Sequence, residues 1–72
     1  MPELMRTDFM ESYAIIEDWL FRMDLKYGTD AIYDDDYYYG CELLNAYDDG
    51  VLTPELYEEM EDFCLVTFNR AL

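Results

Sequence analysis

Histidine is absent from this 72-residue sequence, and basic residues are scarce. Four Lys and Arg stand against eighteen Asp and Glu, for a formal net charge of −14. Without an imidazole, Ser12 and the two cysteines lack the base of the common nucleophilic triads. The absence of closely spaced cysteines also argues against a four-ligand zinc site. Four scattered cations cannot form the patch that holds nucleic acid or an anionic membrane.

Long apolar runs and disulfide patterns are missing as well. No run approaches the roughly 18–20 residues of a membrane span, and no N-terminal signal is visible, so we expect a cytoplasmic protein. Cys41 and Cys64 are too few for a disulfide framework. We expect both to be reduced core residues, and we expect no metal and no cofactor.

Apolar residues, in contrast, are plentiful. The chain is 53% hydrophobic and 18% aromatic, with eight Tyr, four Phe and one Trp. A disordered acidic chain has few such residues, so this composition predicts a folded domain. At this length we expect a single domain over residues 1–72.

Apolar spacing predicts a first helix over residues 8–27, with Thr7 as its N-cap and Gly28 ending it. Ile15 and Trp19 should widen its buried face. The stripe with steps of four and three residues consists of Phe9, Tyr13, Ile16, Leu20, Met23 and Tyr27.

Two further helices are predicted over residues 34–49 and 54–70. Gly50 should stop the second helix, whose Gly40 indicates a close helix crossing or a kink. Thr53 and Pro54 are typical of an N-cap and a first helical position. Three helices with short connections predict an all-α, compact three-helix bundle. The expected core of the last two comprises Tyr37, Gly40, Cys41, Leu43, Leu44, Tyr47, Leu56, Met60, Phe63, Cys64, Thr67, Phe68 and Ala71.

Calcium binding and catalysis by paired carboxyls are two functions that acidic residues often serve, and both fit this sequence poorly. Asp49 and Gly50 resemble part of a calcium loop, but its twelfth position, which requires Glu, is Leu56. A catalytic pair of carboxyls needs a cleft and separated pKa values, which a bundle of this size has little room to provide. We therefore do not expect an enzyme.

Acids and tyrosines instead predict a contact surface. Helical neighbours point about 100° apart, so Tyr37, Tyr38 and Tyr39 cannot all be buried. Carboxylates at i, i+3, i+4 and i+7 place charges every ~5–6 Å, near the phosphate spacing of one nucleic-acid strand. Fourteen charges also match about 24 Å of duplex, close to the expected diameter of the protein. The predicted contact set is Asp34, Asp35, Asp36, Tyr38, Tyr39, Tyr47, Asp48, Asp49, Glu55, Glu58, Glu59 and Asp62.

In size, acidity, aromatic content and lack of catalytic groups, the whole chain resembles the small acidic DNA-mimic proteins of phages and mobile elements. These include anti-CRISPR proteins, antirestriction proteins and uracil-DNA glycosylase inhibitors. The resemblance implies a phage-type inhibitor in the host cytoplasm. Its partner would be a basic nucleic-acid-binding protein, such as a CRISPR effector or a restriction or repair enzyme, whose DNA site the carboxylates occupy.

Other interpretations of the same sequence remain open. One is a small acidic adaptor or assembly subunit that docks through exposed apolar and tyrosine side chains, with its acids providing solubility. Another is general acidity suited to a salty cytoplasm. The sequence leaves open whether the chain is a monomer or a homodimer.

Overall fold

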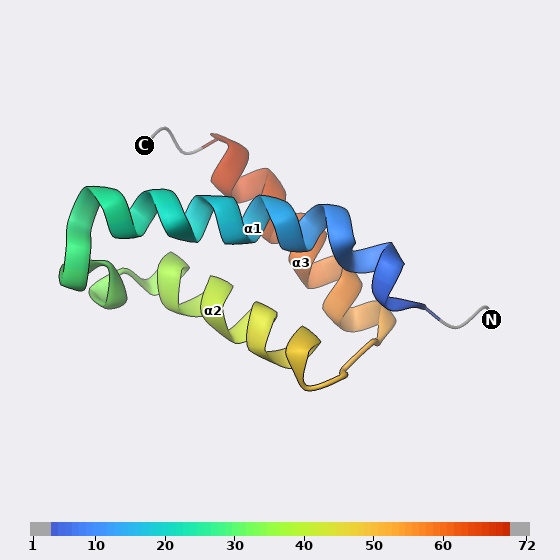
Figure 1. Cartoon of the computed structure of the whole chain (residues 1–72). Helices are drawn as coiled ribbons and strands as arrows, with labels where there is room; N and C mark the ends of the chain where they lie inside the picture. Colours follow the sequence, from blue (N-terminus) through green and yellow to red (C-terminus); the bar gives the residue numbers. More distant parts are fainter. Residues whose placement is uncertain (1–3, 70–72) are drawn as a thin grey trace.

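Caps and glycines divide the described part of the chain, residues 4–69 of a computed structural model, into three α-helices and a short 3-10 helix. They are α1 (Arg6–Tyr27), η1 (Gly28–Tyr33), α2 (Asp35–Asp48) and α3 (Pro54–Asn69), and residues 4–69 contain no strand. α2 runs back along α1, and α3 crosses behind α1 (Figure 1). The predicted all-α three-helix bundle is confirmed.

Most of the predicted helix ends are present. Thr53 Oγ1 accepts from the Leu56 N–H at 3.2 Å, as expected of an N-cap. α2 begins at Asp35, one residue after its predicted start, because Asp34 caps it by accepting hydrogen bonds from the backbone N–H groups of Asp36 and Tyr37. Gly28 and Gly50 adopt positive φ angles of 60° and 88°, which favour glycine.

The predicted Thr7 cap is wrong, because α1 begins at Arg6, two residues before the predicted start, and its N-cap is Met5. Asp8 accounts for the earlier start: its carboxylate accepts the backbone N–H of Met5 at 2.7 Å and so satisfies a group at the helix terminus. The predicted end of α3 at Arg70 and the core position Ala71 lie outside the described residues.

The core lies between all three helices. Phe9, Ile16, Met23 and Met60 are completely buried, and no described acid is buried. Two predictions for the buried face of α1 are wrong: Ile15 and Tyr27 are each 42% exposed. Ile15 lies at the rim of a groove between α1 and α3, and Tyr27 is the last residue of α1, beside the Lys26 ammonium.

Gly40 marks the crossing of α2 with its neighbours, as predicted. It is buried, and a Cβ atom placed on it would lie 3.0 Å from Phe63 Cζ and 3.1 Å from Leu20 Cδ2. Phe63 in turn packs edge-on against Trp19, with ring centroids 5.6 Å apart. The absence of a side chain at position 40 therefore lets α2 approach the contact between α1 and α3.

Both cysteines are free thiols and half-buried. Burial is the main cause that raises the pKa of each thiol. The Cys64 thiol donates a hydrogen bond to the backbone carbonyl of Ser12 at 3.6 Å, which links α3 to α1.

The molecule is more elongated than a sphere of its size, with extents of 41 × 23 × 17 Å. The sequence predicted a protein about as wide as the 24 Å of duplex that carries the same charge. Because the long axis is 41 Å, this match does not hold along it. α1 sets that axis, since its 22 residues span about 33 Å. Within residues 4–69, no helix combines the length and the apolar character needed to cross a bilayer.

Replacing Gly40 with Ala should lower the free energy of unfolding by about 1 kcal/mol. Overpacking a core costs roughly 1–3 kcal/mol, whereas Ala gains only about 1 kcal/mol over Gly inside a helix. Urea denaturation followed by circular dichroism measures the change. Asn45→Ala, at an exposed position of the same helix, is the control and should stabilise slightly. A Gly40→Ala protein more stable than the parent would contradict the close crossing.

Candidate interaction surface

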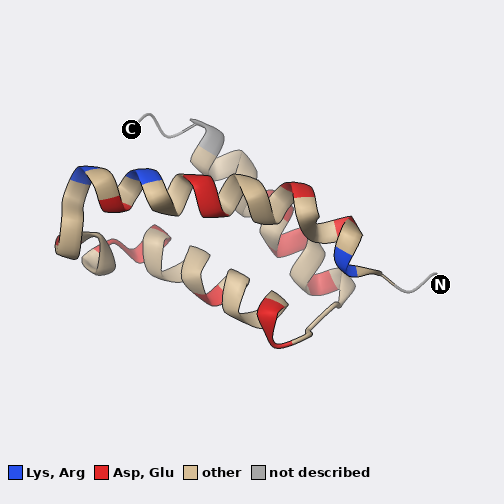
Figure 2. Cartoon of the chain, viewed as in Figure 1, with Lys and Arg blue, Asp and Glu red and all other residues tan. Residues whose placement is uncertain are grey.

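Cations and acids are distributed unevenly over the fold. The sequence has no Lys or Arg between Lys26 and Arg70, so all cations of residues 4–69 belong to α1, whereas acids occur on every helix (Figure 2). The one ion pair within these residues joins Arg22 to Asp18 on α1 at 3.0 Å. The carboxylates of α2 and α3 thus have no cation on their own helices within the described chain.

An acidic ridge, which we define as Glu55, Glu58, Glu59 and Asp62, follows the outer side of α3. All four side chains are exposed, and their steps of three and four residues place them on adjacent turns. Every member belongs to the predicted contact set. Leu56, Met60 and Phe63 on the same helix are buried, so packing of these residues orients the ridge outward.

Tyr39 connects the acidic ridge to α2. Its ring packs 5.7 Å from that of Phe63 and is 40% exposed. The pKa of Tyr39 is raised first by burial, then by the charge of Glu59 and a hydrogen bond to it, and then by Asp62 and Glu42. Acids from two helices therefore gather around one tyrosine. Glu42 was missed in the predicted set, although it follows Tyr39 by three residues, a spacing that places both on one side of a helix.

The tyrosines of the 33–39 run have different environments. Tyr33 and Tyr38 are 83% and 57% exposed, which confirms that the run cannot be buried whole. Tyr37 points to α1, where its hydroxyl donates to Asp24 Oδ1 at 2.8 Å. This hydrogen bond is the largest cause that raises the pKa of Tyr37 to about 12.

The three aspartates before these tyrosines also differ. One carboxylate oxygen of Asp34 is occupied by the helix cap, and Asp34 and Asp36 are half-buried. Asp35 is exposed in the first turn of α2, where a negative charge is favoured by the helix dipole. Part of this predicted cluster therefore serves the fold as well.

Asp48 and Asp49 lie at the other end of α2, where the helix dipole disfavours them. Both are exposed, and the last turn of α2 has no basic residue of its own. Arg6 of α1 compensates in part: it donates to the carbonyl of Tyr47 at 3.4 Å and lies 5.1 Å from the centroid of the Tyr47 ring. Two acids at a helix C-terminus are a local conflict of the kind that occurs at functional surfaces.

Tyr47, another predicted contact residue, belongs mostly to the fold. Its ring lies 4.9 Å from that of Tyr13 and 5.7 Å from that of Phe9, and its hydroxyl donates to the Arg6 carbonyl. Tyr47 is half-buried in this aromatic cluster. Tyr47 is therefore mainly a packing residue, whereas the neighbouring Asp48 and Asp49 are exposed.

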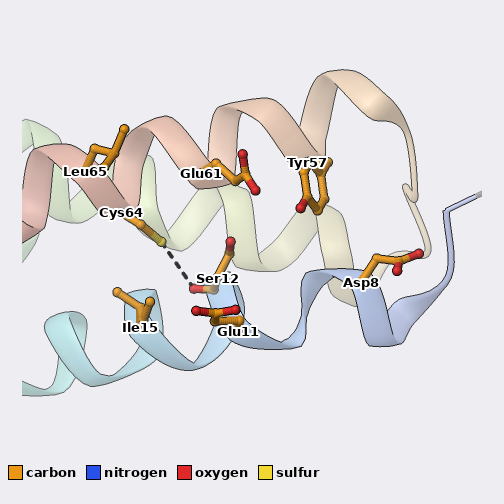
Figure 3. A pocket seen from close by; sticks show the side chains of 8 residues that line it. All are labelled: Asp8, Glu11, Ser12, Ile15, Tyr57, Glu61, Cys64 and Leu65. Atoms are coloured by element: carbon orange, nitrogen blue, oxygen red, sulfur yellow. Dashed lines mark hydrogen bonds between the residues drawn. The ribbon is translucent and has the colours of Figure 1, made fainter.

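A groove of about 250 Å³ lies between α1 and α3, and sequence reasoning did not predict it (Figure 3). Carboxylates from both helices line it, together with Ile15 and Leu65, which supply apolar surface. An acidic wall beside an apolar one suits a Lys or Arg side chain, whose aliphatic stem packs while its charged head pairs. The lining residues are Asp8, Glu11, Ser12, Ile15, Tyr57, Glu61, Cys64 and Leu65.

Tyr57 and Cys64 in this groove both have a raised pKa, and burial is the first cause for the Cys64 thiol. A hydrogen bond to Glu61 is the first cause that raises the pKa of Tyr57. Within residues 4–69, no three Cys, Asp or Glu side chains converge as ligands for a metal ion.

Comparison of the chain with models of protein families, with curated proteins and with solved structures gives no match. The interpretation of these surfaces therefore depends on their own geometry and charge.

Replacing Tyr37 with Phe should lower the free energy of unfolding by about 1 kcal/mol near neutral pH, because the hydrogen bond to Asp24 is lost. The pKa of Tyr37 is about 12 in the fold, against about 10 in an unfolded chain. The bond therefore contributes fully below pH 10 and is lost as the pH rises from 10 towards 12. Urea titrations over this range should show parent and variant converging. Tyr38→Phe, at an exposed site, serves as control, and a difference that persists undiminished at pH 12 would contradict this assignment.

Proposed function

We propose that this chain is a phage-type inhibitor that binds the basic nucleic-acid-binding surface of a host defence protein and so blocks DNA binding. A CRISPR effector is the leading target class, and a restriction or repair enzyme offers the same chemistry. The observation that carries the proposal is the acidic surface of α2 and α3, helices that contribute no Lys or Arg within the described chain, although Arg6 of α1 reaches the C-terminus of α2. The proposal assigns the chain no catalytic role and places it in the host cytoplasm.

Charge spacing supports mimicry of one nucleic-acid strand. The acidic ridge has carboxylates on successive turns, ~5–6 Å apart. Averaged over the 41 Å length, a net charge of −14 gives about one charge per 3 Å. One strand of DNA has a phosphate per 3.4 Å of axis, and both strands together have one per ~1.7 Å. The protein therefore slightly exceeds the charge density of a single backbone and has about half that of duplex.

Inhibition in this proposal is competitive exclusion. Long-range attraction between the acidic surface and a Lys- and Arg-lined channel accelerates association. Exposed Tyr38 and Tyr39 then add apolar contact beside the carboxylates, which slows dissociation. The groove between α1 and α3 accepts a basic side chain from the edge of the same channel.

Asp48 and Asp49 favour this proposal over acidity for solubility alone. Solubility requires only net charge, which can be placed anywhere on the surface. Two acids at the C-terminus of α2 oppose the helix dipole, so their position costs stability without a benefit to the fold.

An acidic adaptor or assembly subunit is the alternative, and exposed apolar side chains on α1 favour it. Phe21 and Leu25 are 59% and 72% exposed. Docking through these residues would be nearly insensitive to salt, whereas phosphate mimicry weakens as salt rises. Salt dependence therefore separates the two candidates.

Neutralising two acids of the ridge, Glu58→Gln with Asp62→Asn, should weaken target binding by about tenfold, since an exposed ion pair contributes roughly 0.2–1 kcal/mol. The immobilised chain is used to capture basic proteins from host lysate at low and at moderately high salt. Each captured protein is then bound to a fluorescent DNA duplex, whose displacement by parent or variant is followed by anisotropy.

The matched control is Glu17→Gln with Asp18→Asn, which removes two charges from α1 and should leave displacement unchanged within about twofold. Displacement of the duplex by the parent, lost in the ridge variant and weakened by salt, supports the proposal. The proposal would be overturned if the ridge variant displaced the duplex as well as the parent does. It would also be overturned if captured proteins stayed bound at high salt and the chain never displaced DNA from them.

A further inference from the structure

An apolar stripe lies on the side of α1 opposite the core. We define this outer stripe as Met10, Ala14, Phe21 and Leu25, whose steps of four, seven and four residues keep them on one line of a helix. Met10, Phe21 and Leu25 are 59%, 59% and 72% exposed, respectively. Neither α2 nor α3 covers this line, because both pack against the face that bears Phe9, Ile16 and Met23.

The outer stripe lies on the element where the molecule is least negative. α1 carries Arg6, Arg22 and Lys26 together with the acids Asp8, Glu11, Glu17, Asp18 and Asp24. From Tyr27 to Asn69 the chain has acids and no cation. A second copy that approached α2 or α3 would therefore meet uncompensated like charge, whereas at α1 it meets charges of both signs.

A shallow hollow interrupts the outer stripe. It has a volume of about 390 Å³ and is lined by Ala14, Glu17, Asp18 and Phe21. Alternation of a small and a large residue along a helix allows a second helix to interdigitate with it. Ala14 and Phe21 are equidistant from the midpoint of the stripe, as are Met10 and Leu25, so an antiparallel copy places Phe21 opposite Ala14 and Met10 opposite Leu25.

We infer that the outer stripe is the interface of a weak homodimer in which the α1 helices of two copies pack antiparallel. In this arrangement Phe21 of each copy enters the hollow beside Ala14 of the other. Arg22 comes near Glu11 of the second copy, whereas Glu17 and Asp18 of both copies lie near the two-fold axis, where salt screens their repulsion. The acidic surfaces of α2 and α3 stay uncovered in both copies. This inference is independent of the proposed function.

The dimer is weak because its interface is small and both copies are strongly acidic. One face of a helix about 33 Å long buries less than the roughly 1,200 Å² of the smallest standard interfaces, so we expect a dissociation constant of about 10–500 µM. Salt screens the repulsion between two bodies of charge −14, so added salt should strengthen dimerisation. Target binding in the proposed function has the opposite salt response.

Sedimentation velocity of the full chain at about 5–500 µM protein, in 50 and 500 mM NaCl, tests the inference. The parent should shift from monomer to dimer, with the midpoint at lower protein concentration in high salt. Phe21→Gln with Leu25→Gln should raise the dissociation constant at least about tenfold. Both side chains are exposed, and Gln is a good helix former, so circular dichroism should be unchanged.

Ile32→Gln with Tyr33→Gln is the matched control, because these η1 side chains are 60% and 83% exposed but lie off α1. It should dimerise like the parent. A parent that stays monomeric at every concentration and salt would overturn the inference. So would a Phe21 and Leu25 variant that dimerises as strongly as the parent, or a control that loses dimerisation equally.

A charge swap tests the antiparallel orientation. Arg22→Glu and Glu11→Lys should each weaken self-association several-fold when measured alone. Mixing the two variants should restore it, because the acid introduced by Arg22→Glu in one chain then meets the amine introduced by Glu11→Lys in the other. The unchanged Glu11 of the first chain and the unchanged Arg22 of the second still pair on the opposite side of the two-fold axis. No restoration on mixing would exclude the antiparallel arrangement.

Discussion

Repulsion among carboxylates constrains this structure more than any other interaction. A net charge of −14 on 72 residues favours expansion of the chain, and the fold opposes it with one apolar core in which Phe9, Ile16, Met23 and Met60 are fully buried. Because a buried, unpaired charge is far more costly than an exposed one, every described acid lies at or near the surface. The charged surface is thus a direct consequence of the way in which the core forms.

α1 has the central place in this arrangement. It packs against both α2 and α3, and it carries all cations of residues 4–69. Arg6 reaches the C-terminus of α2, where it offsets part of the helix dipole beside Asp48 and Asp49. Within the described chain, α2 and α3 are left with carboxylates alone. α1 therefore carries charges of both signs, whereas α2 and α3 carry only acids within the described chain.

The two surfaces have different proposed partners. In the proposed function, the carboxylates of α2 and α3 bind a basic channel. The outer stripe of α1 presents apolar side chains with charges of both signs and suits a second copy of the chain. Since salt screens attraction in the first case and repulsion in the second, the two proposed associations should respond to salt in opposite ways.

Local signals accounted for most of the fold. Thr53, Pro54 and the glycines at positions 28 and 50 act through hydrogen bonds and backbone angles of their immediate neighbours, so their roles follow from the sequence. Thr7 was misjudged because Asp8 satisfies an earlier backbone group. Ile15 was misjudged because helical periodicity identifies a face but not where a neighbouring helix stops covering it.

The sequence by itself determined the three helices, the acid-free core and the long interval without cations, since each depends on residue type and spacing along the chain. Only the tertiary structure decided which acids meet. Glu42 joins Glu59 and Asp62 around Tyr39 because Gly40 lets α2 approach Phe63, and Asp8 and Glu11 face Glu61 because α3 crosses α1 there. Such contacts depend on the angles and distances between helices, which arise from packing of the whole core.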